Sequence, residues 1–151
     1  MFQPKEILVP TDFSEYSERA LQQAVELAVQ FGSKIHLVHV TTHDTDHMPM
    51  FFLDDEKVSE VKRHLADYND QQMQAKIDKY IKDKKLNYEV HECSGSPYNE
   101  VLKLAEKLKV DLIVISSKGK NAMEGFFFGS TTEKVVRKAK CSVFVVRNVL
   151  Q

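Results

Sequence analysis

Blocks of apolar residues change their period several times along this chain, and the period predicts the local structure. Short runs that are apolar throughout, at Ile7–Val9 and Leu112–Ile115, are typical of strands that are covered on both faces. Segments in which apolar residues recur at intervals of three and four are typical of amphipathic helices. The clearest of these helices follows the first strand, with its apolar face at Ala20, Leu21, Ala24, Val25, Ala28 and Phe31.

Three further segments are predicted as strands: residues 34–40, 87–93 and 142–146. The strand at 87–93 alternates apolar and polar residues, as suits a half-exposed edge strand. Because strands alternate with helices, we predict a single α/β domain over residues 1–151, a five-stranded parallel open sheet with helices on both faces. Placing the most apolar strands at the centre gives the Rossmann-like order 3-2-1-4-5. This order reverses between strands 1 and 4, where open α/β sheets bind ligands.

Helix ends are marked by residues with known capping preferences. Gly32 stands where a helix can end in the left-handed conformation, and Ser96 followed by Pro97 marks the start of the third helix. The last helix is predicted to begin near Ser130. The apolar stripes expected on the second and third helices are Val58, Val61, Leu65, Ile77 and Ile81, and Val101, Leu102, Ala105 and Leu108.

The fifth strand is apolar on both faces yet is placed at an edge of the sheet. An exposed edge of this kind invites pairing with another chain. Antiparallel pairing of two fifth strands across a two-fold axis would cover it. We therefore predict a homodimer through Val143, Phe144, Val145 and Val146. The alternative is that a loop or the tail of the same chain covers this edge.

Composition limits the classes of function. Of the 151 residues, 42% are apolar and 28% charged, an ordinary balance for one globular domain. The net charge of −1 gives no general attraction to nucleic acid or a membrane surface. We expect no membrane span and no secretion signal, because apolar runs are short throughout. Cys93 and Cys141 fit no metal or redox spacing, so we expect two reduced thiols in a cytoplasmic protein.

The stretch Ile113–Thr132 carries the main candidate chemistry. It reads as a buried strand, a glycine-bearing loop and the polar start of a helix, where N–H groups can hold an anion. The first strand ends at Pro10, Thr11 and Asp12, and Asp12 offers a carboxylate to the same predicted crevice. The loop contains neither a P-loop motif nor GxGxxG. Its own pattern is S-x2-G-x9-G-S, formed by Ser116, Gly119, Gly129 and Ser130.

Together these features resemble the universal stress protein family, whose nucleotide-binding members carry G-x2-G-x9-G-(S/T) at this place. The likeness covers nearly the whole chain, including the opening ILVPTDFSEYSERAL, the strand end at His39-Val40, the run DLIVIS and the closing GSTTEKVVRKAKCSVFVVR. The resemblance implies an adenine nucleotide alpha hydrolase-like fold. It also implies a small cytoplasmic homodimer that is often ATP-binding and associated with stress tolerance.

The resemblance further implies roles for individual residues. Asp12 would hold the adenine or ribose end of the nucleotide, and the backbone of Val40 would meet the base. The loop backbone and the helix start would wrap the phosphates and donate to them, through Gly119, Gly129, Ser130 and Thr131. The expected ligand is ATP or a related adenine nucleotide, alone or with Mg²⁺.

Ser116 departs from the family pattern, which has glycine at this position. A Cβ here could crowd the ligand, whereas the serine hydroxyl could add a contact to it. Lys118 and Lys120 beside the loop would favour phosphate, unless they are simply solvated. For each of these three residues, the sequence leaves open whether the side chain contacts the ligand.

Two other candidate residues also have structural alternatives. Ser130 and Glu133 match a capping box, which would satisfy the helix start without any ligand. Asp12 could act only as a turn former before the first helix.

Residues 41–54 have no clear period and are predicted as a loop. This loop holds a set of potential metal ligands, His43, Asp44, Asp46 and His47. Because no helical pattern places both histidines on one face, we expect a polar loop rather than a metal site. The apolar segment Met48–Phe52 could line the pocket, contact a second subunit or bind a partner, whereas Phe126–Phe128 is expected to pack.

No serine–histidine–aspartate spacing and no paired acids stand out as a catalytic site. The sequence therefore predicts a homodimeric stress-response regulator that binds an adenine nucleotide between strands 1 and 4. Two alternatives stay open. One is a protein-interaction dimer that binds no nucleotide, and the other is a slow ATPase or nucleotidyl transferase on the same fold.

Overall fold

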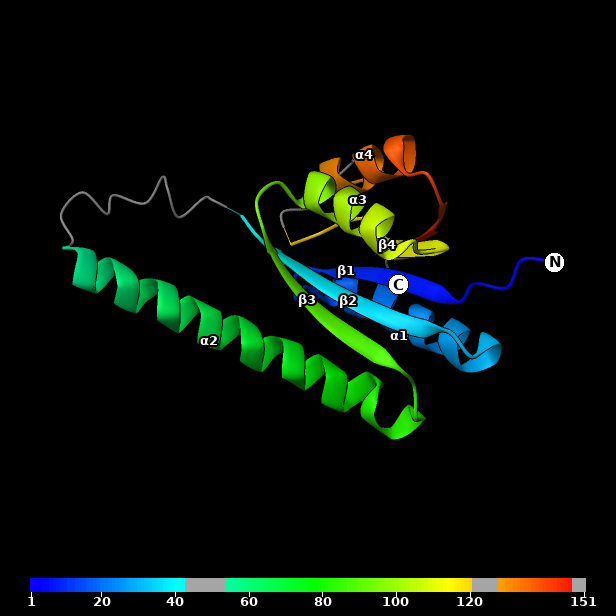
Figure 1. Ribbon diagram of the computed structural model, residues 1–151, viewed down its shortest axis with the longest axis horizontal. Coiled ribbons are helices and arrows are strands. Elements are labelled where there is room, and N and C mark those ends of the chain that lie inside the picture. Colours follow the sequence, from blue (N-terminus) through cyan, green and yellow to red (C-terminus); the bar gives the residue numbers. More distant parts are fainter. Residues whose placement is uncertain (43–53, 121–127, 148–151) are drawn as a thin grey trace.

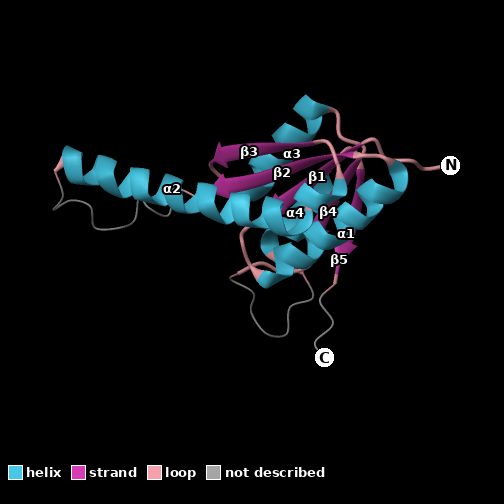
Figure 2. Ribbon diagram, turned by 90° about the horizontal axis from the view of Figure 1, so that it is seen from below, coloured by secondary structure: helices cyan, strands magenta, loops and turns pink. Residues whose placement is uncertain are grey.

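The computed structural model describes residues 1–42, 54–120 and 128–147. They form a five-stranded parallel sheet in the order β3-β2-β1-β4-β5, with helices on both faces (Figure 1, Figure 2). The strands are β1 Glu6–Thr11, β2 Lys34–Thr41, β3 Tyr88–Ser94, β4 Leu112–Ser116 and β5 Ser142–Val146. The helices are α1 Glu15–Phe31, α2 Asp55–Tyr80, the 3-10 helix η3 Lys82–Lys84, α3 Pro97–Leu108 and α4 Ser130–Lys138. The predicted fold class and strand order are confirmed.

β1 lies at the centre of the sheet, and both of its faces are covered. Ile7, Leu8 and Val9 are each 0% exposed. Because successive residues of a strand point to opposite faces, Ile7 and Val9 join the apolar cluster formed with α1 and α2. Leu8 joins the cluster formed with α3 and α4. This double coverage is the reason that β1 reads as an unbroken apolar run.

The predicted helix ends agree with the structure in α1 and α3. Gly32 ends α1 with a φ of +69°, a conformation that glycine adopts without strain. Ser96 is the N-cap residue of α3 and Pro97 lies in its first turn, although the Ser96 side chain makes no capping hydrogen bond. Phe31, expected on the buried face of α1, is 37% exposed because it is the last residue of the helix. Leu104 is a buried residue of α3 that the spacing did not identify.

The long helix α2 differs from the prediction along its first half. Its buried residues are Met73 and Ile77, whereas Leu65 of the expected stripe is 38% exposed. A helix of 26 residues is about 39 Å long, longer than the sheet beneath it, and its first turns extend past the sheet (Figure 1). Among the described residues, no helix is both long and apolar enough to cross a membrane.

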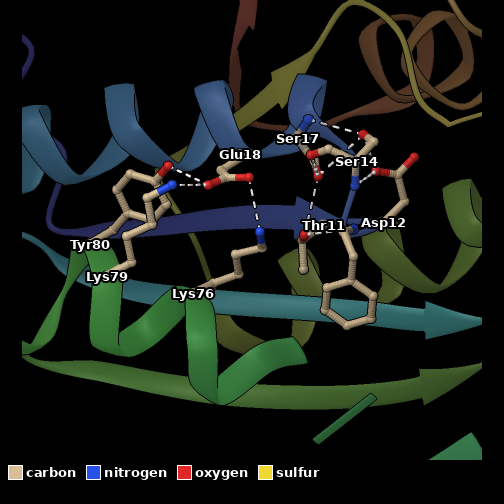
Figure 3. Close-up of polar contacts among 9 residues, drawn as sticks. Thr11, Asp12, Ser14, Ser17, Glu18, Lys76, Lys79 and Tyr80 are labelled. Carbon is tan, nitrogen blue, oxygen red and sulfur yellow. Dashed lines mark hydrogen bonds and ion pairs between the residues drawn. The ribbon is translucent and has the colours of Figure 1, made fainter. Parts of the chain in front are cut away.

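A single carboxylate fixes the second half of α2 on α1. Glu18 accepts hydrogen bonds from Lys76 Nζ at 2.9 Å, from Lys79 Nζ at 2.7 Å and from the Tyr80 hydroxyl (Figure 3). Burial opposes ionisation of Glu18, but the hydrogen bonds from Lys79, Tyr80 and Lys76 outweigh it and lower its pKa to about 2. This ionised group therefore ties α2 to the rest of the domain.

We expect Glu18→Gln to lower the free energy of unfolding at pH 7 by about 1–2 kcal/mol, allowing for solvent screening of the ion pairs. The folded-state pKa lies below the ordinary value of 4.5. The ionised carboxylate therefore stabilises the wild-type protein fully above about pH 4.5, and the contribution is lost as the pH falls towards 2. Urea unfolding at pH 7 and at pH 3 measures the difference, which should shrink at pH 3.

The control for this prediction is Asp67→Asn, which removes an exposed carboxylate from the middle of α2. It should change the free energy of unfolding little at either pH. A Glu18→Gln variant as stable as the wild type at pH 7 would contradict the role assigned to Glu18.

Candidate functional site

The carboxyl end of β1 turns directly into α1 and is held from inside the fold. Phe13 has a φ of +64°, unusual for a residue with a side chain, and its N–H donates to Thr11 Oγ1 at 3.1 Å. Thr11 is buried, and its hydroxyl lies 3.2 Å from that of Ser17 (Figure 3). The side chain of Thr11 thus supports the turn from within. Pro10, just before it, is half-buried and pairs in register with Val38 of β2.

Asp12 follows Thr11 and joins two distant parts of the chain. Its Oδ1 accepts from the backbone N–H of Ser14 at 3.0 Å and from the Ser14 hydroxyl, and its Oδ2 accepts from the N–H of Lys120 at 2.8 Å. Burial raises its pKa, but these hydrogen bonds prevail and hold the pKa below its ordinary value. Asp12 is therefore ionised at neutral pH. A carboxylate offers about four lone-pair positions, and hydrogen bonds from Ser14 and Lys120 occupy three of them among the described residues.

Gly119 lies against this carboxylate. A Cβ added at position 119 would stand 2.6 Å from Asp12 Oδ2, closer than real Cβ contacts allow. Any other residue at position 119 would therefore require the loop of residues 116–120 or the Asp12 carboxylate to move. The family resemblance implies that Gly119 lets the loop backbone wrap the phosphates. Its closeness to Asp12 is a second reason for glycine at this position, and it does not depend on a ligand.

Ser116 uses its hydroxyl within the loop. The side chain is buried, and Oγ donates to the carbonyl oxygen of Lys118 at 2.7 Å. The carbonyl oxygen of Ser116 accepts from Thr132 Oγ1, also at 2.7 Å, which fastens α4 to the end of β4. Sequence reasoning missed Thr132. The only sequence feature that could have indicated this contact is a threonine in the first turn of a polar helix.

The start of α4 faces the same loop. Gly129 is the N-cap residue, its N–H donates to the Ser117 carbonyl at 2.7 Å, and a Cβ at 129 would lie 3.8 Å from Lys118 Cα. The N–H groups of Ser130 and Thr131 have no acceptor among the described residues. A helix N-terminus with free N–H groups attracts anions.

The predicted capping box of Ser130 and Glu133 is wrong. Ser130 is the first helical residue rather than the N-cap, and α4 has no side-chain capping bond. Glu133 instead pairs with Arg137 at 2.8 Å, one turn further along the helix. The helix start is therefore not satisfied by its own side chains.

The end of β2 lies beside these elements in the sheet. Val40 is half-buried and comes just after His39, which pairs in register with Thr11 of β1. The His39 ring stacks on Phe13 with 4.4 Å between ring centroids, and its Nδ1 is paired with Glu92. Sequence reasoning gave neither Phe13 nor His39 a role in this region, because a stacking contact between a turn and a neighbouring strand leaves no local pattern.

Some predicted features lie outside the described residues. These are His43, Asp44, Asp46, His47, Met48–Phe52, Phe126 and Phe127. Phe128 is described and is 44% exposed, so the packing expected for it is not seen in this part of the chain. A hollow of about 460 Å³ lies elsewhere, between α1 and the end of β5. We place the candidate site at Asp12 instead, because the carboxylate, the loop and the helix start meet there.

Comparison with known proteins gives a consistent result. The model of the universal stress protein family matches residues 4–147 of this chain. The universal stress protein MJ0531 of Methanocaldococcus jannaschii is 32% identical over 143 residues, which are 95% of this chain and 82% of that protein. The solved structure of MJ0577, a universal stress protein of the same organism, matches with a TM-score of 0.86 at 28% identity. The match covers 99% of this chain and 100% of that one.

Two more distant structures contain nucleotides. A universal stress protein in complex with cAMP has a TM-score of 0.62 at 22% identity, covering 97% of this chain and 98% of that one. A universal stress protein from Archaeoglobus fulgidus in complex with dAMP has a TM-score of 0.61 at 22% identity, covering 95% and 98%. At this identity the two structures show a shared fold.

Proposed function

The chain belongs to the universal stress protein family, and on that basis we propose that it binds an adenine nucleotide, ATP first of all, between the carboxyl ends of β1 and β4. The nucleotide acts as a ligand that biases the conformation of a homodimer, or its choice of partner, in a stress response. We place this regulator in the cytoplasm, a location that cell fractionation tests.

The observation that carries the proposal is the hydrogen bond from the Lys120 N–H to Asp12 Oδ2. It holds the loop after β4 against the end of β1, and the start of α4 lies against the same loop. A sugar or base donor can use a lone pair of Asp12. Phosphate oxygens can accept from the N–H groups of Ser130 and Thr131, which have no acceptor in the described part of the chain. The site would thus present an acceptor, Asp12, to the sugar or base and N–H donors, at the start of α4, to the phosphates.

The nucleotide complexes of the two distant structures support this class of ligand. Both cAMP and dAMP contain adenine, a sugar and a phosphate. Lys118 and Lys120 add positive charge beside the loop and would favour a longer phosphate chain. Mg²⁺ would be held largely by those phosphates, because among the described residues the site offers one carboxylate, Asp12, and the hydroxyls of Ser130 and Thr131.

We also propose that two chains pair through β5. Among the described residues β5 pairs in the sheet only with β4, and Phe144 is 42% exposed. An unprotected apolar edge favours a second strand, and a two-fold axis closes the contact. The hollow beside this edge could receive side chains of the second copy, and it is lined by Arg19, Gln22, Gln23, Phe144, Val145, Val146 and Arg147.

One observation favours a second function, a protein-interaction dimer that binds no nucleotide. The hydroxyl of Ser116 is bonded to Lys118 O, so it is not offered to a ligand. If the phosphates must contact the backbone of residue 116 directly, which glycine would allow, the Cβ of Ser116 would keep them out.

We expect Gly119→Ala to lower the affinity for Mg-ATP at least about tenfold, equal to 1.4 kcal/mol. The added Cβ, 2.6 Å from Asp12 Oδ2, would displace the Asp12 carboxylate or the loop, and either change disturbs the site. Isothermal titration calorimetry measures the affinity, and mass spectrometry of denatured protein shows whether a nucleotide copurifies.

The matched control is Gly32→Ala, the same substitution at the end of α1, where no atom lies within 4 Å of the added Cβ. It should lower stability, because the left-handed conformation favours glycine, but leave ATP affinity unchanged. A wild-type protein that gives no heat at millimolar Mg-ATP would overturn the proposed binding.

Ser116→Gly separates the two functions. If the wild-type protein binds ATP, the variant should change the affinity by less than about tenfold, because Ser116 Oγ is engaged with Lys118 O. If the wild-type protein does not bind and the variant does, Ser116 blocks the site and the interaction dimer is the better account. Parallel calorimetric titrations of both proteins give the answer.

We expect Phe144→Glu to convert the dimer into monomers in sedimentation, because two buried charges would face each other across the strand pair. Val145→Glu should act in the same direction, although Val145 is also half-buried within its own chain. Val90→Glu is the control, a valine of β3 that is 42% exposed, as Phe144 is, and lies at the opposite edge of the sheet. Unchanged mass in both β5 variants would count against this interface.

A further inference from the structure

A second polar cluster lies at the amino ends of β1, β2 and β3, the ends opposite to the proposed nucleotide site. It consists of Glu6, His36, Glu89 and His91. His36 is in register with Glu89, and His91 is two residues further along β3. Residues two apart in a strand share a face, so His36 and Glu6 lie on the side of Val38 and Leu8. That side packs with α3 and α4.

His36 is the centre of this cluster. It is 3% exposed, and both of its ring nitrogens have partners. Nε2 lies 2.6 Å from Glu6 Oε2, and Nδ1 lies 3.0 Å from His91 Nε2. Nδ1 is also 3.5 Å from Glu89 Oε2. Both nitrogens of this buried imidazole are thus satisfied by polar groups, as burial requires.

Three atoms of the cluster form a triangle of the size that a tetrahedral metal ion requires. His36 Nδ1, His91 Nε2 and Glu89 Oε2 are separated by 3.0, 3.5 and 3.6 Å. Zinc binds such nitrogen and oxygen atoms at about 2.0–2.2 Å, so two ligands of a regular tetrahedron lie about 3.3–3.6 Å apart. The described side chains therefore approach the spacing of one tetrahedral face.

The hydrogen-bond directions agree with this use. Because the Glu6 carboxylate can only accept, His36 Nε2 carries the proton and Nδ1 presents its lone pair towards His91 and Glu89. A carboxylate behind a ligating histidine is the usual support of a metal-bound imidazole. The other oxygen of Glu89 is engaged by Lys34 Nζ at 2.6 Å, which leaves Oε2 facing the histidines.

We propose that His36, His91 and Glu89 form a zinc-binding site, with Glu6 as the residue that orients His36. Two imidazoles and one carboxylate are a ligand set that suits zinc. The Glu89 side chain is 49% exposed, so water can fill the fourth position. The ion would cross-link β2 to the edge strand β3 and thereby stabilise the sheet. Nothing in this site depends on the nucleotide.

The test uses the full chain, freed of metal with a chelator and titrated with zinc chloride by calorimetry. We expect one zinc ion per chain and a melting temperature that rises with zinc concentration, because the folded state alone assembles the ligands. Co²⁺ in place of zinc should give the intense visible absorption of tetrahedral coordination.

Two variants at half-buried or exposed positions test the ligands without threatening the fold. His91→Gln and Glu89→Gln should each lower zinc affinity at least about tenfold, and Glu6→Gln about tenfold through the orientation of His36. The control is His64→Gln on α2, an exposed histidine that lies 3.8 Å from Glu60 and represents an ordinary surface pair. It should leave zinc affinity unchanged.

Two results would overturn the proposal. One is a wild-type protein that binds no zinc in the titration. The other is zinc binding that His91→Gln and Glu89→Gln leave intact, because the ion would then be held elsewhere, for example by His43 and His47. Circular dichroism of each variant shows that a loss of binding does not come from unfolding.

Discussion

The pairing of β1 with β4 is the contact on which the rest of this molecule depends. Ile7 lies opposite Leu112 and Leu8 opposite Ile113, so the two strands run in parallel through the centre of the sheet. Their carboxyl ends consequently reach the same edge. The turn at Asp12 and the backbone of Lys120 meet there, although 108 positions separate them in the chain. The proposed nucleotide site is thus a product of strand order rather than of one local motif.

The same parallel alignment gives the two ends of the sheet different chemistry. At the carboxyl ends, the first N–H groups of α4, which have no acceptor among the described residues, and two lysines would favour an anion. At the amino ends, two imidazoles and a carboxylate make a region that favours a cation. His36 is level with Leu8, four residues before Asp12, so about 13 Å of strand separates the two regions.

The edge strands of the sheet are less buried than its central strands. β5 carries apolar side chains at an edge that pairs with no further strand in the described part of the chain, and β3 is largely exposed at the opposite edge. The buried residues of α2, Met73 and Ile77, and its ion pairs with Glu18 lie in its second half. A second chain at β5 and a metal ion between β2 and β3 would each supply cross-links where the core does not.

The α/β class and the strand order could be predicted from the sequence alone, and the place of the site stays a prediction made from it. Burial on both faces leaves an unbroken apolar run in β1 and β4, and the order of elements leaves few topologies. The contacts between distant residues could be seen only in the fold. These include the closeness of Gly119 to Asp12, the inward bond of Ser116, the missing capping bond at Ser130 and the histidine pair of β2 and β3. Local spacing records which face a residue takes, whereas the partner it meets depends on strand register and on where each helix ends.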